Sequence, residues 1–186
     1  IRRELSRTKE LADAALAVLG TRDDIAVTEL CLMDEPLQYF SEGFFAQRER
    51  LLAAKELDHP RFRYAHQFAE ADAIVIAAPF WDLAFPALLK VYIENVSVEG
   101  ITFGCNASGC FGICRAQRML FLTTRGGSYD GAPDEMGARY LEALCGFFGI
   151  PRFDCVAADG LDLGLRPVEE ILAEAKSKAA ALAAAL

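Results

Sequence analysis

Two hydroxyl groups and one positive charge stand together at Ser6-Arg7-Thr8, where the sequence predicts the start of a helix. The N-terminus of a helix adds free backbone N–H groups and the positive end of the helix dipole. Together these groups could hold an anion such as a phosphate. The alternative is that Ser6 only caps the helix, which is a common role of serine.

Two aromatic residues, Phe80 and Trp81, follow a short apolar run at residues 73–78. The run is rich in Ile and Val and too short for an independent helix, so it predicts a strand buried on both faces. Pro79 ends this strand because proline cannot donate to a ladder. Open α/β sheets bind ligands at the carboxyl ends of their strands, where the two rings could receive a planar ligand. The alternative is that the rings only fill the core.

A pair of glycines, Gly126 and Gly127, comes after Thr124 and Arg125 at the end of a further expected strand, residues 118–123. Paired glycines allow a ligand to approach the backbone closely. The alternative is an ordinary turn. In a parallel sheet, segments that follow successive strands meet at one edge, so we expect these glycines, the aromatic pair and the helix start to converge there.

Three clustered cysteines, Cys105, Cys110 and Cys114, suggest a metal site but do not support one. Structural zinc and iron–sulfur sites use four ligands, and no histidine lies near this cluster. We therefore predict no metal, and the role of the cluster stays open. Six cysteines in a chain of 186 residues fit a reducing cytosol rather than a disulfide scaffold. The other three are expected to be small core residues: Cys31, Cys145 and Cys155.

Strands and helices alternate along the chain, which predicts a doubly wound parallel α/β sheet. In this class a strand and a phosphate-binding turn precede the first helix, and here the chain opens at Ile1 with that turn half over. We therefore expect five strands in the order 2-1-3-4-5, the first being absent from this sequence. The other strands are expected at residues 25–32, 73–78, 118–123 and 153–158. Helices are expected from Ser6 to Gly20 and at residues 41–57, 61–70, 86–98, 135–148 and 167–186.

Length and composition favour one domain, residues 1–186, with a sizeable core. A net charge of −8 disfavours nucleic acid as a partner, since phosphate neutralisation needs clustered Lys and Arg. No apolar run approaches the roughly 20 residues that a membrane span requires. We therefore expect a cytoplasmic protein.

The chain resembles the flavodoxin-like NAD(P)H-dependent FMN oxidoreductases, which include FMN-dependent azoreductases and NAD(P)H:quinone reductases. The resemblance covers nearly the whole chain, and its motifs stand in the family's order. It rests on residues 6–13, 77–83, 86–90, 92–94, 100–103, 122–127 and 140–150, and on Gly160.

The resemblance implies a non-covalent FMN site at the sheet edge. Hydroxyls and amides at the first helix would hold the phosphate, the segment after the strand at 73–78 would flank the isoalloxazine and ribityl chain, and the glycine loop would cover the other side of the flavin. A polar ring, Tyr129, would lie on the substrate side. The implied cofactor-binding residues are Ser6, Arg7, Thr8, Pro79, Phe80, Trp81, Asp82, Leu83, Thr124, Arg125, Gly126 and Gly127.

The implied activity is ping-pong hydride transfer from NADH or NADPH through the flavin to quinones, azo compounds or similar acceptors. A homodimer is also implied, and the apolar helix at residues 86–98 offers it a surface. The alternative function is a flavodoxin-type electron carrier that does not oxidise NAD(P)H. The long insertion between Leu32 and Ala71 and the match at residues 100–103 favour the enzyme. An iron–sulfur flavoprotein is disfavoured by the cysteine spacing.

Two positions depart from many relatives of this family. Asp82 stands where an amide is common, so its carboxylate could place a negative charge near the flavin. The alternative is that only its backbone meets the flavin, while its side chain points to water or caps the helix after Pro86. Residues 104–112 lack the Lys and Tyr of the usual hairpin, which leaves the acceptor open.

Overall fold

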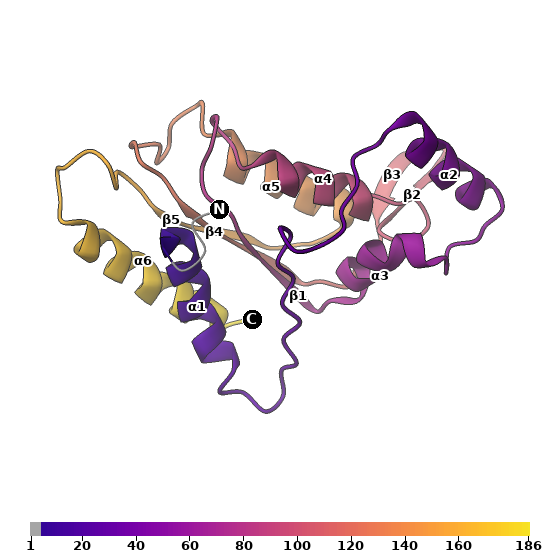
Figure 1. Ribbon diagram of the computed structural model, residues 1–186. Coiled ribbons are helices and arrows are strands. Elements are labelled where there is room, and N and C mark those ends of the chain that lie inside the picture. Colours follow the sequence, from indigo (N-terminus) through magenta and orange to yellow (C-terminus); the bar gives the residue numbers. More distant parts are fainter. Residues whose placement is uncertain (1–4) are drawn as a thin grey trace.

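The centre of the molecule is a parallel sheet of three strands in the order β1-β4-β5, seen in a computed structural model that describes residues 5–186 (Figure 1). The strands are β1 (Ala73–Ala77), β4 (Arg118–Thr124) and β5 (Phe153–Ala158). β4 lies between the other two and is buried along almost its whole length, as a strand paired on both edges and covered on both faces must be. The three predicted strands after residue 70 are confirmed.

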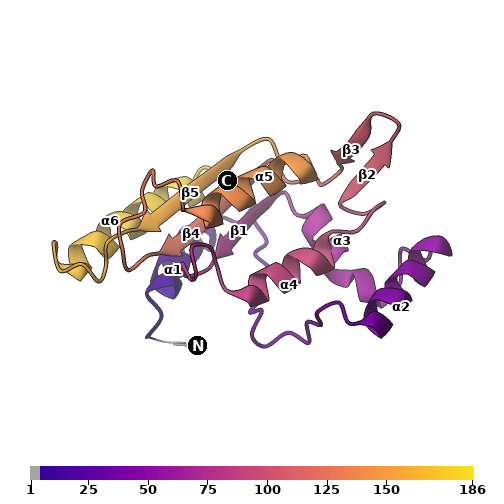
Figure 2. The ribbon, with the colours of Figure 1, turned by 90° about the horizontal axis from the view of Figure 1, so that it is seen from above.

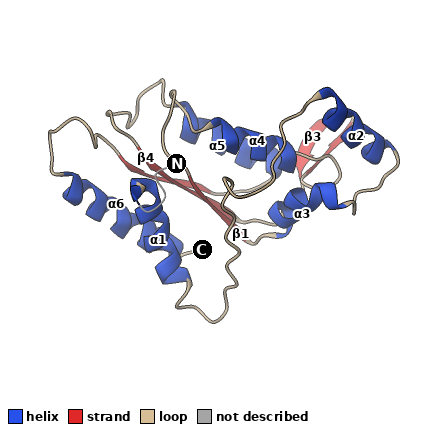
Figure 3. Ribbon diagram, viewed as in Figure 1, coloured by secondary structure: helices blue, strands red, loops and turns tan. Residues whose placement is uncertain are grey.

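Helices cover both faces of this sheet, which confirms the doubly wound α/β class (Figures 1 and 3). On one face lie α1 (Arg7–Leu19) and α6 (Val168–Ala183). The core of the other face is built with α3 (Arg63–Glu70), α4 (Ala87–Val96) and α5 (Met136–Phe148). Beyond α3 lie α2 (Glu42–Ala53) and the short helix η2 (Pro60–Phe62).

Small side chains bring α1 and α6 together. Ala175, Ala179 and Ala183 recur every four residues on α6 and are buried, so they form one face of the helix. That face packs with Leu11 and Ala15 of α1 in a shared core over β4 and β5. This packing fixes the start of α1 relative to the end of the sheet.

The predicted strand at residues 25–32 is wrong: this segment forms no ladder with any residue from 5 to 186. Leu30 and Leu32 still pack against the core around α3 and α4. A segment becomes a strand only when its backbone N–H and C=O groups bond to a neighbouring strand, and residues 25–32 form no such bonds with β1, which within residues 5–186 pairs with β4 alone. The five-strand order therefore stays a prediction, since three strands form the described sheet. Val75 of β1 is exposed, so β1 is not buried on both faces as predicted.

Most predicted helices are confirmed with shorter ends. α2 stops at Ala53 because Lys55 takes a left-handed conformation, with φ 58°. The helix predicted at 61–70 begins as the 3₁₀ turn η2 and continues as α3. Pro86 and Pro167 stand just before α4 and α6 rather than inside them.

The cysteine-containing stretch forms an antiparallel hairpin, β2 (Phe103–Asn106) and β3 (Gly109–Gly112), that projects from the rest of the chain (Figure 2). Its register places Cys105 opposite Cys110, and the two form a disulfide. The cysteine spacing leaves the role of this cluster open and does not predict the bond, because spacing alone does not reveal a cross-strand pair. Cys145 is buried as predicted, whereas Cys31 and Cys155 are exposed and not core residues.

Candidate functional site

The carboxyl ends of the three strands lie level with one another. Beyond the ladder proper, the N–H of Phe80 donates to the carbonyl of Thr124 at 3.0 Å, and the N–H of Arg125 donates to the carbonyl of Ala158 at 2.8 Å. The loops after β1, β4 and β5 therefore start from one edge of the sheet. This confirms the expected convergence of the aromatic segment and the glycine pair.

The start of α1 joins the same edge through two threonines. The hydroxyl oxygens of Thr8 and Thr124 lie 2.6 Å apart and share a hydrogen bond, and Thr8 is buried. Next to them, the guanidinium of Arg7 donates to the carboxylate of Asp162 at 2.9 Å. The N-terminus of α1 is thus held against the carboxyl end of β4 and the loop that follows β5.

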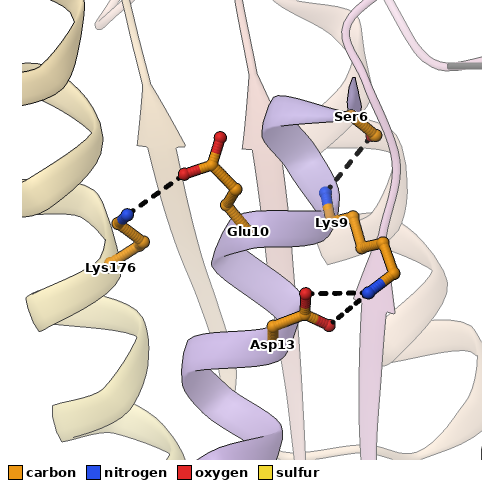
Figure 4. Close-up of polar contacts among 5 residues, drawn as sticks. All are labelled: Ser6, Lys9, Glu10, Asp13 and Lys176. Atoms are coloured by element: carbon orange, nitrogen blue, oxygen red, sulfur yellow. Dashed lines mark hydrogen bonds and ion pairs between the residues drawn. The ribbon is translucent and has the colours of Figure 1, made fainter. Parts of the chain in front are cut away.

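Polar contacts along α1 keep its first turns in place (Figure 4). The Ser6 hydroxyl accepts a hydrogen bond from the N–H of Lys9 at 3.3 Å, so the predicted capping role of Ser6 is confirmed. The Lys9 ammonium pairs with Asp13 along the helix, and Glu10 pairs with Lys176 of α6 at 3.1 Å. Capping uses only a lone pair of the Ser6 oxygen, so its O–H group can still donate to an anion.

The loop after β1 presents its aromatic residues to two different surroundings. The rings of Phe80 and Tyr129 pack with their centroids 4.5 Å apart, and Phe80 is half-buried. Trp81 and Leu83 are 44% and 43% exposed. Core filling therefore accounts for Phe80 at most, and Trp81 and Leu83 offer an open apolar surface at the sheet edge.

A tight turn at residues 81–84 holds that surface in place. Trp81 and Ala84 exchange two backbone hydrogen bonds, and both residues between them are left-handed, Asp82 with φ 48° and Leu83 with φ 65°. Such angles cost a residue with a side chain about 1 kcal/mol or more, which is typical of functional sites. The interpretation of Asp82 as the cap of α4 is wrong, because the N-cap position is Pro86 and no side chain caps that helix.

The Arg125 side chain is already paired within the protein and is not free to bind a ligand at the sheet edge. Its guanidinium is buried between two carboxylates, 3.0 Å from Glu135 and 3.6 Å from Asp159. Glu135 in turn caps α5 by accepting from the N–H of Ala138, and Asp159 accepts from the N–H of Tyr129. We name Arg125, Glu135 and Asp159 the carboxylate–arginine hub, which ties the loop after β4 to α5 and to the loop after β5.

The glycine pair is required by its neighbours. A Cβ at Gly126 would lie 2.5 Å from the Asp162 carboxylate, and a Cβ at Gly127 would lie 2.9 Å from the Tyr129 ring. Their carbonyls accept from Asp162 and Gly160, whereas their N–H groups donate to no acceptor within residues 5–186. The turn therefore presents two free backbone donors beside the aromatic rings.

Sequence reasoning missed three carboxylates that organise the site: Glu135, Asp159 and Asp162. Each follows a strand or precedes a helix, which is the usual place of residues that hold loops. Position alone, however, did not reveal that all three pair with arginines. The signal that could have found Glu135 is its place at the start of the helix predicted at residues 135–148, where acidic residues act as caps.

A cavity of about 830 Å³ opens beside the hub, between the loop after β4, the outer edge of β5 and α6. Arg125, Tyr129 and Cys155 line it, whereas Thr8 and Phe80 do not. Within residues 5–186, no group of three or more His, Cys, Asp or Glu side chains is placed to hold a metal ion. Over the same residues, every helix is too short or too polar to cross a membrane.

Curated relatives match about two thirds of the chain. An FMN-dependent NADH:quinone oxidoreductase of Clostridium perfringens (strain ATCC 13124) is 49% identical over 121 residues, which are 65% of this chain and 61% of that protein. An FMN-dependent NADH:quinone oxidoreductase 2 of Clostridium acetobutylicum is 46% identical over 125 residues, 66% of this chain and 62% of that protein. These matches thus span about three fifths of each relative's length.

Solved structures and a family model match nearly all of the chain. An azoreductase from Bacillus anthracis str. Sterne superposes with a TM-score of 0.88 at 27% identity, covering 99% of this chain and 94% of that one. An FMN-dependent NADH-azoreductase of Bacillus anthracis str. Ames Ancestor, solved in complex with FMN, shares the fold with a TM-score of 0.82 at 22% identity, covering 96% and 92%. The model of the flavodoxin-like fold family matches residues 1–183. On this match, and with a parallel sheet covered by helices on both faces, the chain belongs to the flavodoxin-like fold family.

Proposed function

We propose that residues 1–186 form one FMN-binding domain of an NAD(P)H oxidoreductase that reduces quinones, azo compounds or similar acceptors. The names of the relatives from both Clostridium species support this activity. The observation that carries the proposal is the bond between Thr8 and Thr124, which places an anion-binding helix start beside the loops of the sheet edge.

The phosphate end of FMN fits the start of α1. The first N–H groups of a helix lack partners within the helix, and the positive end of the dipole attracts anions. Ser6 adds a hydroxyl, and Arg7 adds a positive charge that Asp162 holds close by. These donors match the needs of a phosphate monoester, which is an anion with several acceptor oxygens.

The ring end of FMN fits the opposite side of the same edge. Phe80, Trp81 and Leu83 would flank the isoalloxazine, with Pro79 and Asp82 next to the ribityl chain. The free N–H groups of Gly126 and Gly127 would donate to acceptor atoms at the pyrimidine edge. Tyr129, which packs on Phe80, would border the substrate.

The roles of Arg125 and Thr124 differ from the direct FMN contacts that the resemblance implied. The Arg125 N–H is already bonded to Ala158 and its guanidinium is bound within the hub. Arg125 therefore acts as a positioning residue that orients the glycine turn, and Thr124 acts through its bond to Thr8.

Bound FMN would supply the redox chemistry by taking a hydride from NADH or NADPH and passing reducing equivalents to the acceptor. The residues of this chain would bind the flavin, orient its ring at the exposed aromatic surface and leave one side open for both substrates in turn. No ionisable triad is needed for such a reaction.

A homodimer acting in the cytoplasm completes the proposal. Leu89 of α4 lies in the core and Tyr92 packs against it, so α4 offers less free apolar surface than its sequence suggested. The exposed apolar side chains of Trp81 and Leu83 provide another surface for a second copy. Light scattering at micromolar concentration should give twice the mass of one chain, and the mass of a single chain would refute the dimer.

The activity is tested by steady-state oxidation of NADH and NADPH with menadione as acceptor, using protein loaded with FMN. We expect turnover with at least one of the two nucleotides. When both substrates are varied, double-reciprocal plots of the initial rate should give parallel lines, as a ping-pong reaction requires. Bound FMN without any oxidation of either nucleotide would instead indicate a flavodoxin-type electron carrier, and the enzyme proposal would fail.

A further inference from the structure

The hairpin of β2 and β3 is anchored at its base and exposed at its tip (Figure 2). At the base, Gly112 lies against the backbone of Phe148 and Gly149, so closely that a Cβ would fall 1.8 Å from the Phe148 carbonyl carbon. The rings of Phe103 and Phe147 add a contact with centroids 4.6 Å apart. The strand residues nearer the turn, 105–111, are exposed to solvent.

Few noncovalent interactions hold the tip. The ladder has four residue pairs, and the last of them, Asn106 with Gly109, encloses a turn of two residues. Within that turn the Asn106 side-chain oxygen accepts from the N–H of Ser108 at 2.8 Å. A two-stranded hairpin of this size is marginally stable in water when nothing covers it. The disulfide between Cys105 and Cys110, one pair from the turn, is therefore the strongest constraint on the tip.

We propose that Cys105 and Cys110 form a thiol-exchange site, a pair that cycles between disulfide and dithiol by reaction with dithiol reductants, and that its reduction unpairs the hairpin tip. This proposal does not depend on FMN. It goes beyond the proposed oxidoreductase activity because the pair lies on the projecting hairpin, whereas the proposed flavin residues lie on α1 and the loops after the parallel strands.

The thiol–disulfide exchange proceeds in two steps. A thiolate of the reductant attacks one cysteine sulfur and breaks the S–S bond, which gives a mixed disulfide and releases the other cysteine as a thiolate. The second thiolate of the reductant then attacks the mixed disulfide and releases the first cysteine. The two cysteine thiolates take up two protons, and the reductant leaves as its own disulfide, oxidised by two electrons.

The surroundings of the pair favour this chemistry. Cys105 and Cys110 are both exposed to solvent, so a reductant can reach the disulfide bond. Residues 100–114 contain no charged side chain, so the segment itself does not repel an anionic thiolate. The neighbouring Cys114 is a bystander: its thiol donates to the Thr102 carbonyl at 3.4 Å, and burial raises its pKa to about 11.

The redox half of the proposal is tested by differential alkylation with peptide mapping. Native protein is treated with or without millimolar dithiothreitol, and free thiols are then blocked with iodoacetamide. We expect alkylation of Cys105 and Cys110 to rise together from near zero to near completion without denaturant, and to return to near zero after reoxidation with oxidised glutathione. The proposal would be overturned if Cys105 and Cys110 stayed unalkylated in native protein after dithiothreitol treatment. It would also be overturned if the two reduced cysteines did not re-form their disulfide.

The structural half is tested by hydrogen exchange of the same samples. Reduction should speed exchange of amides in residues 103–112 at least tenfold and leave those of β4 unchanged. The double variant Cys105→Ser/Cys110→Ser should match the reduced protein and no longer respond to dithiothreitol, whereas Cys31→Ser, which removes an exposed unpaired thiol, should keep the full response. Equal protection of residues 103–112 in the oxidised and reduced protein would refute the unpairing.

Discussion

The sheet edge and the hairpin are both built outside the parallel strands, but different forces hold them. At the sheet edge, three loops and one helix are joined by ion pairs and hydrogen bonds between residues far apart in sequence, such as Arg125 with Asp159 and Thr8 with Thr124. The hairpin has its own local ladder, a packed base at Gly112 and a covalent bond near its turn. One region is fixed by the rest of the fold, and the other largely by itself.

This difference suits the roles proposed for the two regions. A flavin site needs donors held in place before the ligand arrives, because binding then costs less conformational entropy. The carboxylate–arginine hub provides that order for the glycine turn. A projecting hairpin with one reducible bond can change its order without disturbing the sheet, since its tip contributes nothing to the core.

The largest effect is expected from removing the centre of the hub. Arg125→Met keeps the apolar stem of the side chain but removes the guanidinium, so the buried carboxylate of Glu135 and the half-buried one of Asp159 lose their shared cation. Breaking a buried pair in this way costs about 3–5 kcal/mol. Urea unfolding should show a loss of that size in the free energy of unfolding.

The matched control for this variant is Arg115→Met. Arg115 pairs with Asp72 at 2.7 Å, but both side chains are well exposed. Exposed pairs contribute about 1 kcal/mol or less. Equal losses in the two variants would contradict a buried hub.

A smaller loss is expected at the base of the hairpin. Gly112→Ala would force a Cβ against the backbone of Phe148, which cannot rotate away, so the base must separate from the end of α5. Overpacking of this kind costs about 1–3 kcal/mol, and we expect the upper part of that range in thermal or urea unfolding.

Gly146→Ala on α5 is the control for this effect. Apart from its chain neighbours and the nearby backbone of α5, no atom of residues 5–186 lies within 4 Å of a Cβ at this position, so the variant should gain up to about 1 kcal/mol of helix propensity. A Gly112→Ala protein as stable as Gly146→Ala would show that the hairpin base is not packed as described.

The smallest effect concerns pH and separates the free thiol of the base from the bonded pair of the tip. Burial raises the pKa of Cys114 to about 11 in the folded protein, above its ordinary value of 9.0. The stabilisation by this protonated thiol is complete below about pH 9 and is lost as the pH rises toward 11, because the unfolded chain gives up the proton first. Between pH 8 and pH 10 we expect about 1 kcal/mol of lost stability from this group.

Between pH 8 and pH 10, the free energy of unfolding of Cys114→Ala should fall by about 1 kcal/mol less than that of the unsubstituted protein. Cys31→Ala, which removes an exposed thiol, should keep the full pH dependence. The same slope in all three proteins would contradict a protonated thiol at the hairpin base.

Much of the fold follows from local patterns in the sequence. The run at residues 73–78 and the proline after it predicted β1, and Gly149, with φ 78°, ends α5 as expected of a left-handed glycine. Residues 25–32 are also mostly apolar but form no strand in the described structure, since pairing depends on a partner and not on the segment alone.

Contacts that depend on a distant partner were also hard to predict in the two regions outside the sheet, the sheet edge and the hairpin. The glycine pair and the aromatic residues were predicted because turns and strand ends have local signatures. The hub was not, since the bonds from Arg125 to Glu135 and Asp159 join positions that only the folded chain brings together. The disulfide was missed because a metal site and a cross-strand bond can share one cysteine spacing.

The most direct test of the central claim is an FMN titration of the flavin-free protein, followed by quenching of flavin fluorescence, with Thr8→Val and Thr21→Val measured alongside. Thr8 bonds to Thr124 at the proposed phosphate end, whereas the Thr21 hydroxyl donates to the Val18 carbonyl at the far end of α1. We predict that the unsubstituted protein binds FMN, that Thr8→Val weakens binding about tenfold, equal to about 1.4 kcal/mol, and that Thr21→Val changes it less than twofold. No uptake of FMN, or equal affinities in the two variants, would contradict the account.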